Sequence, residues 1–268
     1  MNNQPIGILD SGVGGLSIWR EIVSILPYES TVYIADSTNC PYGTKSSREI
    51  YFLAKRLVNF LVQKKVKLVV IACNTITVCC LDKLRKDFKN LPIVGTVPAI
   101  KTAVEHSRNR KIGILSTPVT SESKYQKDLI ERFAKDCVVI NLGIDKLVAF
   151  VERGETEGEK VKEVIKEELK QFVEHNVDTI AIGCSHFPFL QKTIGEVMGE
   201  NVEILDPGKA IARQVKRVLE NNNYLSSSNN PSYVFYTTGN TEEFTQVSKR
   251  LLGRKISPSI NEVHKVSL

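Results

Sequence analysis

Two cysteines, Cys73 and Cys184, are the residues of this sequence best placed to do chemistry. Each one ends a short apolar run and precedes a polar residue that can begin a helix. The first backbone N–H groups of a helix are unpaired, so they lower the pKa of a nearby thiol and can bind a substrate carboxylate. One cysteine in such a place would be a buried structural thiol, but two in equivalent places predict function. The two segments are Cys73-Asn74-Thr75 and Cys184-Ser185-His186.

A glycine-rich turn contains a second candidate group, the carboxylate of Asp10. Its spacing does not fit the G-x-G-x-x-G pattern of a dinucleotide loop, and a carboxylate there would repel phosphate. The same carboxylate suits an ammonium group, so we predict an amine-binding loop, with an ordinary tight turn as the alternative. His186, two positions after Cys184, is a candidate general acid/base because imidazole titrates near neutral pH. The turn reads Asp10-Ser11-Gly12-Val13-Gly14-Gly15.

The other four cysteines show no pattern typical of redox or metal chemistry. Cys79 and Cys80 lie in a segment of helical period, where adjacent side chains diverge, so packing is the favoured interpretation. Cys40 precedes Pro41 in a loop, and Cys137 opens a predicted strand. The sequence contains no Cys-x-x-Cys and no Cys/His spacing typical of zinc. We therefore expect no metal site.

These side chains need a scaffold, and the sequence predicts alternating strands and helices. Short apolar runs predict strands at 6–10, 31–35, 68–72, 93–96, 111–116, 138–142, 179–183, 202–205 and 232–236. Helical period predicts helices at 15–26, 46–63, 76–88, 99–106, 121–133, 158–175, 189–198, 209–222 and 241–251. Strands separated by helices imply crossover connections and a parallel sheet. Ligands bind beyond the carboxyl ends of such strands, where both cysteines are expected.

Two pairs of similar segments indicate that the chain consists of two related halves. Residues 6–11, IGILDS, resemble 112–117, IGILST, and residues 66–73, VKLVVIAC, resemble 177–184, VDTIAIGC. Chance similarity between parallel strands is the alternative, but both pairs occur in the same order. The Asn- and Ser-rich run 221–232 is typical of a surface loop. The strand and helix after it are too short for a third domain, so we expect this tail to return to one of the halves.

Composition excludes several classes of protein. The 268 residues are 42% hydrophobic and 25% charged, as in globular proteins, and the net charge of +6 does not require an anionic partner. Neither a secretory pattern nor an apolar run of about 20 residues is present, so we expect no membrane span. The basic residues lack interleaved aromatic side chains, which disfavours nucleic-acid binding. We expect a cytoplasmic protein whose cysteines are thiols.

Four motifs, taken together and in this order, resemble those of the cofactor-independent glutamate racemases of the aspartate/glutamate racemase superfamily. The resemblance runs along nearly the whole chain. It implies an α/β fold with two pseudo-symmetric domains, each a mostly parallel sheet flanked by helices, and an active site in the cleft between them. The first domain would comprise residues 1–97 and 208–268, and the second 98–207. The motifs are residues 10–15, Pro41-Tyr42-Gly43, Ala72-Cys73-Asn74-Thr75 and Gly183-Cys184-Ser185-His186.

The resemblance also implies roles for individual residues. Cys73 and Cys184 would exchange protons with opposite faces of the substrate α-carbon. We expect Asp10 to assist Cys73, and His186 with Glu152 to assist Cys184. The substrate would contact Asp10, Ser11, Pro41, Tyr42, Gly43, Asn74, Thr75, Thr117, Thr120, Ser185 and His186.

The implied activity is the interconversion of L- and D-glutamate without a cofactor, which supplies D-glutamate for peptidoglycan synthesis, and a homodimer is expected. The alternatives are an aspartate racemase of the same superfamily and a non-catalytic amino-acid-binding protein. Three positions depart from the family pattern. Ser185 and Phe187 stand where Thr and Tyr are usual, and Asn39 stands where Arg is common. These changes concern substrate fit or rate, because they leave both thiols in place.

Overall fold

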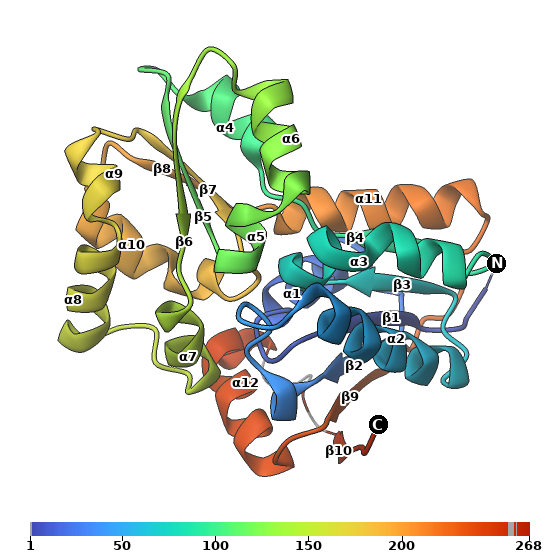
Figure 1. Cartoon of the computed structure of the whole chain (residues 1–268). Coiled ribbons are helices and arrows are strands. Elements are labelled where there is room, and N and C mark those ends of the chain that lie inside the picture. Colours follow the sequence, from blue (N-terminus) through green and yellow to red (C-terminus); the bar gives the residue numbers. More distant parts are fainter. Residues whose placement is uncertain (1, 257–259, 261) are drawn as a thin grey trace.

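The computed structural model describes every residue except 1, 257–259 and 261, and it contains two parallel β-sheets flanked by helices (Figure 1). The larger sheet has six strands in the order β10-β9-β2-β1-β3-β4, and the smaller has four in the order β6-β5-β7-β8. Each strand pair among the described residues is parallel. This architecture agrees with the predicted α/β fold class.

The strands of the larger sheet come from both ends of the chain. They are β1 (Ile6–Asp10), β2 (Thr31–Ala35), β3 (Leu68–Ile71), β4 (Ile93–Gly95), β9 (Tyr233–Thr237) and β10 (Val263–Lys265). Strand β9 pairs with β2, so the tail adds to the sheet that the N-terminal strands begin. The smaller sheet comprises β5 (Lys111–Ser116), β6 (Val138–Gly143), β7 (Thr179–Gly183) and β8 (Glu203–Leu205). The domain boundaries at 97/98 and 207/208 stay a prediction.

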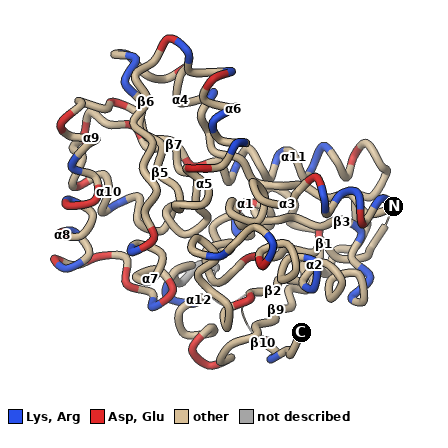
Figure 2. The backbone as a smooth tube through the Cα atoms, viewed as in Figure 1, with Lys and Arg blue, Asp and Glu red and all other residues tan. Residues whose placement is uncertain are grey.

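Helices cover both sheets. The longer ones are α1 (Leu16–Ile25), α2 (Ser47–Gln63), α3 (Asn74–Asp87), α6 (Lys124–Phe133), α8 (Glu159–Glu168), α10 (Gln191–Met198), α11 (Gly208–Asn221) and α12 (Thr241–Ile256). The shorter ones are α4 (Ile100–His106), α5 (Pro118–Glu122), α7 (Lys146–Glu152) and α9 (Lys170–Glu174), with 3₁₀ helices η1 (Ser37–Asn39) and η2 (Phe187–Leu190). Lys and Arg alternate with Asp and Glu along the outer helices (Figure 2).

The sequence predicted nearly all of these elements, and the exceptions have local causes. Helix α7 and strand β10 were missed because both are short. The helix expected at 121–133 is two helices, since Ser123 has extended backbone and its side chain accepts a hydrogen bond from Gln126 N at 3.1 Å. The helix expected at 158–175 divides at Leu169.

Strands β1 and β5 occupy equivalent positions in the two sheets, which places the predicted functional residues. Strand β1 lies between β2 and β3, and β5 lies between β6 and β7. The register pairs Leu9 with Ile71 in one sheet and Ser116 with Gly183 in the other. Consequently Asp10, at the end of β1, lies beside the segment that leads from β3 to Cys73. Cys184 directly follows β7, which pairs with β5 as β3 pairs with β1.

Strands β1 and β3 of the larger sheet are covered on both faces. All of their residues are buried, and helices α1 and α11 pack on one another beside this sheet. The indole of Trp19 donates a hydrogen bond to Thr31 Oγ1 at 2.9 Å and packs edge-on against Phe235. Within the described residues, none of the helices has the length and hydrophobicity to cross a bilayer.

Candidate active site

The carboxyl ends of strands from both sheets meet at a small cavity. Every residue around it is buried except Pro41, so a bound molecule would be enclosed. Most of the residues predicted to contact a substrate line it. The lining residues are Ser11, Pro41, Tyr42, Gly43, Cys73, Asn74, Thr75, Thr117, Val148, Cys184, Ser185 and His186.

Three predicted residues lie directly behind this lining. Asp10 is fully buried, and its Oδ1 accepts a hydrogen bond from Ser185 Oγ at 3.1 Å. Glu152 is connected to the cavity by its contact with His186. Thr120 is connected to it by Thr117, since the two threonine hydroxyl groups lie 3.0 Å apart. Val148 lines the cavity although the sequence did not indicate it.

Cys73 is the residue that precedes α3, and its thiol is buried. Burial and the nearby charge of Asp10 raise the pKa of this thiol well above its ordinary value, although the Ile76 backbone N–H and the Ser11 hydroxyl act in the opposite direction. The prediction of a lowered pKa at the helix N-terminus was therefore wrong for Cys73, because burial outweighs the helix N–H groups here. The thiol is protonated and needs a base to become a thiolate.

Asp10 is a carboxylate held in a low-dielectric place. Burial raises its pKa to about 6, while the charge of His186 and the N–H of Gly12, at 3.0 Å from Oδ2, act to lower it. Its hydrogen bond from Ser185 connects the last residue of β1 with a residue after β7. Asp10 is thus ionised near neutral pH and lies between the segments that carry the two cysteines.

A chain of contacts leads from Cys184 to a glutamate. Cys184 Sγ lies 3.7 Å from His186 Nδ1, and His186 Nε2 lies 2.6 Å from Glu152 Oε1. The same oxygen accepts a hydrogen bond from Val13 N at 2.9 Å. Burial lowers the pKa of His186, but hydrogen bonds with Cys184, Cys40 and Glu152 outweigh it and hold that pKa well above the ordinary value. The imidazolium can therefore orient the thiol and stabilise its thiolate form.

The two cysteines have equivalent positions in the sheets, but the segments after them differ. A helix of 14 residues begins directly after Cys73. Cys184 is followed by η2, which has 4 residues, before α10 begins. The imidazole of His186 is the group that faces the Cys184 thiol, whereas helix N–H groups and Asp10 face Cys73.

Two hydroxyl groups from segments that follow strands of the two sheets meet at the cavity. Thr75 Oγ1, in α3, lies 2.9 Å from Thr117 Oγ1, which follows β5. Gly43 approaches the same place so closely that a Cβ atom there would lie 2.8 Å from Asp145 Oδ1. Asn74 Nδ2 is buried and has no hydrogen-bond acceptor among the described residues. It is a free donor at the cavity wall.

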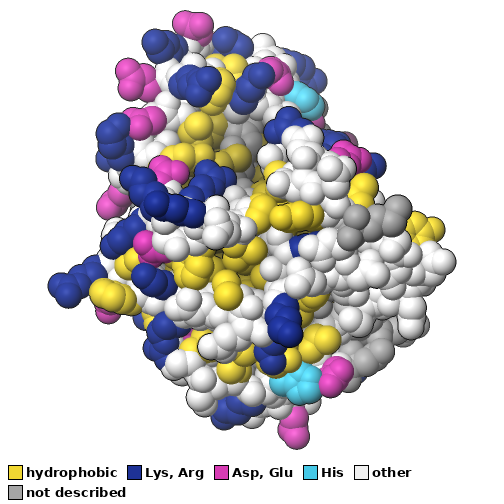
Figure 3. Space-filling model, turned by 90° about the vertical axis from the view of Figure 1, so that its right-hand side faces the viewer, with side chains coloured by type: hydrophobic (Ala, Val, Ile, Leu, Met, Phe, Trp, Pro, Cys, Tyr) yellow, Lys and Arg dark blue, Asp and Glu magenta, His cyan; other side chains and the backbone are white. Residues whose placement is uncertain are grey.

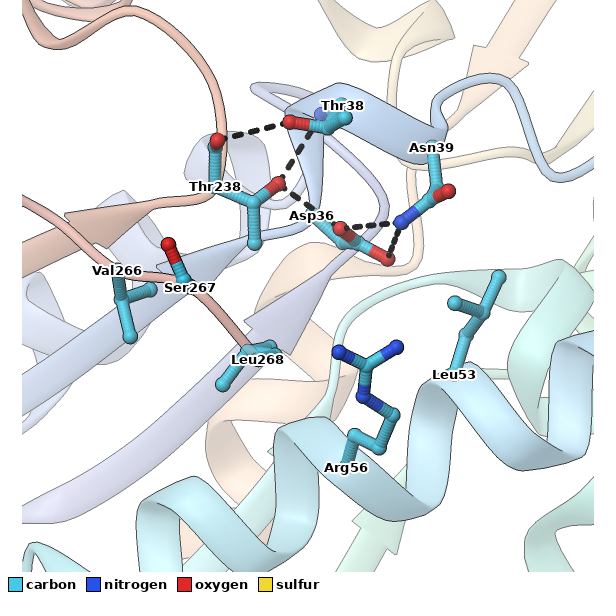
Figure 4. A pocket seen from close by; sticks show the side chains of 9 residues that line it. All are labelled: Asp36, Thr38, Asn39, Leu53, Arg56, Thr238, Val266, Ser267 and Leu268. Atoms are coloured by element: carbon cyan, nitrogen blue, oxygen red, sulfur yellow. Dashed lines mark hydrogen bonds between the residues drawn. The ribbon is translucent and has the colours of Figure 1, made fainter.

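The loop that carries Tyr42 is anchored on Asp36. Tyr42 Oη donates a hydrogen bond to Asp36 Oδ2 at 2.5 Å, and Thr238 Oγ1 donates to Oδ1 at 2.8 Å. Asn39 Nδ2 donates to both carboxylate oxygens at 3.0 Å, and Arg56 extends toward the same carboxylate (Figure 4). Asn39, which departs from the family pattern, therefore helps to fix this loop.

Comparison with known proteins places the chain in a family. The model of the Asp/Glu/Hydantoin racemase family matches residues 6–215. The chain belongs to this family. A glutamate racemase of Clostridium botulinum is 36% identical over 251 residues, which are 93% of this chain and 97% of that protein. Two solved glutamate racemases have the same fold. The Bacillus anthracis enzyme has a TM-score of 0.90 at 31% identity, covering 100% of this chain and 99% of the other.

The second solved structure contains a bound amino acid. It is a Francisella tularensis glutamate racemase in complex with D-glutamate, with a TM-score of 0.86 at 30% identity. It covers 100% of this chain and 98% of the other. The predicted fold class and the recognised family are thereby confirmed.

Asp145 of this racemase is a feature of the site that the sequence did not reveal. Its Oδ1 is buried without a hydrogen-bond partner among the described residues, and its side chain does not cap α7. Burial raises the pKa of Asp145, with the charge of His186 acting to lower it. No sequence signal could have found this group, because its burial depends on the approach of Gly43.

Replacing Asp145 by asparagine is expected to stabilise the folded racemase at neutral pH. The pKa of Asp145 in the folded protein lies above its ordinary value of 3.8, so the folded state is stabilised while this carboxyl is protonated. That stability is lost as the pH rises from 3.8 through the folded pKa. Asp145→Asn removes this loss, so its gain in Tm should be largest near pH 8 and vanish near pH 3.5. Thermal unfolding at several pH values measures it. Asp128→Asn, at an exposed position paired with Lys124, is the control, and an equal gain there would contradict the explanation.

Proposed function

We propose that this chain is a glutamate racemase that interconverts L- and D-glutamate by moving the α-proton between two thiols, without a cofactor. The observation that carries the proposal is that two buried cysteines line one enclosed cavity. Cys73 follows β3 of the larger sheet, and Cys184 follows β7 of the smaller sheet. Two groups of the same type suit a reaction that runs in both directions, because one must be a base while the other is an acid. The named relatives indicate glutamate as the amino acid.

The residues around the cavity can hold each polar group of an amino acid. Asp10 with the hydroxyl groups of Ser11 and Ser185 suits the ammonium group. Asn74 Nδ2 and the first N–H groups of α3 suit a carboxylate, because these donors lie together at a helix N-terminus and the amide has no acceptor among the described residues. These fixed donors also stabilise the carbanion that forms when the α-proton leaves.

Each thiol has a different partner in this mechanism. When Cys73 is the base and Cys184 the acid, Asp10 accepts the proton of Cys73, and the nearby ammonium group of the substrate stabilises the thiolate that remains. His186, held by Glu152, orients and stabilises Cys184 as a thiolate. One thiol removes the α-proton and the other returns a proton to the opposite face.

The product of the reaction gives the protein its wider role. D-glutamate would be used in peptidoglycan synthesis in the cytoplasm.

The surface of the protein supports a homodimer. Hydrophobic side chains gather across the middle of one face, with Lys and Arg around them (Figure 3). Phe52 and Val62 of α2 are also exposed, at 52% and 44%. Sedimentation of the purified chain measures the oligomeric state, and a monomer at all concentrations would contradict this part.

The activity is tested by incubating L-glutamate with the purified chain in D₂O without added cofactor. We expect optical rotation to fall to zero while deuterium enters the α-position of both enantiomers. L-aspartate assayed in parallel distinguishes an aspartate racemase. Binding of glutamate without α-proton exchange would favour the non-catalytic alternative and reject the proposal.

The pKa of Asp10 predicts the acid side of the pH profile. Asp10 must be ionised to bind ammonium and to accept a proton, so kcat/KM should fall as pH decreases through about 6. Asp10→Asn should be slow at every pH, by about 10²–10⁴-fold, and should lack this dependence. Racemisation rates between pH 5 and 8 measure both effects. An unchanged acid limb in Asp10→Asn would assign it to another group.

A further inference from the structure

A second cavity, distinct from the substrate cavity, lies on the other side of the His186–Glu152 pair. It is bounded by the turn after β1, η1, the end of α7 and the start of α12. Helices α7 and α12 are neighbours in Figure 1, and Arg250 Nη1 donates a hydrogen bond to Arg153 O at 3.3 Å. Cys40 and Glu152 line this second cavity, whereas His186 lines the substrate cavity. The imidazole is therefore close to both spaces.

Three side chains at this boundary form a potential metal-ligand set. The sulfur of Cys40, a carboxylate oxygen of Glu152 and a ring nitrogen of His186 all lie within 4.8 Å of one another. Ligands of tetrahedral Zn²⁺, at about 2.0–2.3 Å from the ion, are about 3.3–3.7 Å apart. Shifts of about an ångström would therefore bring the three donors to a common ion. The three residues are far apart in the sequence, which explains why no zinc spacing was visible there.

We propose that Cys40, Glu152 and His186 bind Zn²⁺ or a similar thiophilic divalent cation, and that the bound ion inhibits the enzyme. Sulfur and imidazole nitrogen select zinc-like ions over Mg²⁺ and Ca²⁺, which prefer oxygen ligands. Because Cys40 and Glu152 line the second cavity, water from that cavity would supply the fourth ligand. Binding needs no catalytic activity. Inhibition rests on the proposed function, because His186 and Glu152 serve Cys184 in that reaction.

The charges around the cluster favour a cation. Glu152 and Glu243 offer carboxylates to the second cavity, and the guanidinium of Arg153 is engaged by Glu155 at 3.0 Å. Asp10, at the end of β1, adds negative charge near the cluster. Burial raises the pKa of Cys40 to about 12, so its thiol holds a proton in the metal-free protein.

Metal binding exchanges protons for the ion. The S–H bond of Cys40 and one N–H bond of the His186 imidazolium break, two protons go to solvent, and metal–sulfur and metal–nitrogen bonds form. Glu152 contributes an oxygen in place of its hydrogen bond with His186. Affinity should therefore increase with pH. The shift of the imidazole toward the ion moves it away from the Cys184 thiol, which lies 3.7 Å from His186 Nδ1 in the metal-free protein.

The binding part is tested with Co²⁺, a spectroscopic substitute for Zn²⁺. Titration of the whole chain should produce a thiolate-to-cobalt charge-transfer band in the near ultraviolet. The band should persist in Cys79→Ser, which removes a half-buried thiol of α3, and in the double variant Cys73→Ser/Cys184→Ser. It should be lost in Cys40→Ser and in Cys40→Val, which keeps the volume of the side chain. Circular dichroism checks that each variant is folded.

The inhibition part is tested with buffered Zn²⁺, each variant being compared with its own zinc-free rate. Zn²⁺ should inhibit the unmodified enzyme and Cys79→Ser equally, and half-inhibition of Cys40→Ser should need at least about tenfold more Zn²⁺. Mg²⁺ at the same concentrations should not inhibit. A band and an inhibition that persist in both Cys40 variants would overturn the proposal and assign the ion to the catalytic thiols. A band without any racemase activity would keep the metal site and reject the proposed function.

Discussion

Racemisation of glutamate should fall by at least about 10²–10⁴-fold in Cys73→Ser and equally in Cys184→Ser, because each variant lacks one of the two acid/base groups. Serine has nearly the same shape as cysteine, so the cavity is preserved. Its hydroxyl is a far weaker acid than a thiol and cannot supply a base near neutral pH. Both thiols are buried at the cavity, so no bulk water can replace them without opening it.

The two variants should also differ from one another in a measurable way. Each retains one thiol, and that thiol faces the α-proton of only one enantiomer. Any residual exchange of α-protons with D₂O in Cys73→Ser should therefore concern one enantiomer, and in Cys184→Ser the other. Cys79→Ser, with a half-buried thiol of α3, is the matched control and should retain full activity. Full activity in either active-site variant would refute the two-thiol mechanism.

The positions of the two cysteines could be predicted because each strand is a short apolar run that is visible in the local sequence. Each apolar run fixed a buried strand, and the similar segments placed Cys73 and Cys184 at equivalent ends. The charge state of Cys73 could not be predicted in this way. A helix N-terminus is visible in the sequence, but the burial that opposes it results from the packing of both sheets around the thiol.

Contacts between distant segments account for most of what the sequence did not show. Glu152 came only from the family resemblance, since its helix α7 is too short to show a clear period. Cys40 looked like a loop residue, and its contact with His186 exists only because β2 and β7 end at the same cavity. Asp145 has a buried carboxylate oxygen because Gly43, far away in the sequence, approaches it closely. These groups modify the chemistry, whereas the strand ends determine where it occurs.

Replacing His186 by asparagine should slow the racemase by about 10²–10³-fold, because this side chain links Cys184 to Glu152. Glu152→Gln should be slowed less, since the amide can still accept a hydrogen bond from the ring while losing the charge that favours the imidazolium. His106→Asn is the matched control. His106 pairs with Glu203 at 2.9 Å on the surface, and its loss should leave the rate unchanged.

The His186→Asn variant should show different isotope effects in the two reaction directions, which a merely structural role would not produce. The two enantiomers have equal free energies, so kcat/KM must fall by the same factor in both directions. Proton removal by Cys184 becomes the slow step, whereas removal by Cys73 keeps its own partners at Asp10 and the Ile76 N–H. With α-deuterated substrates, the isotope effect on kcat should therefore increase in the direction that begins at Cys184 and not in the other. Equal isotope effects in both directions would show that His186 supports the fold of the site rather than the acid/base function of Cys184.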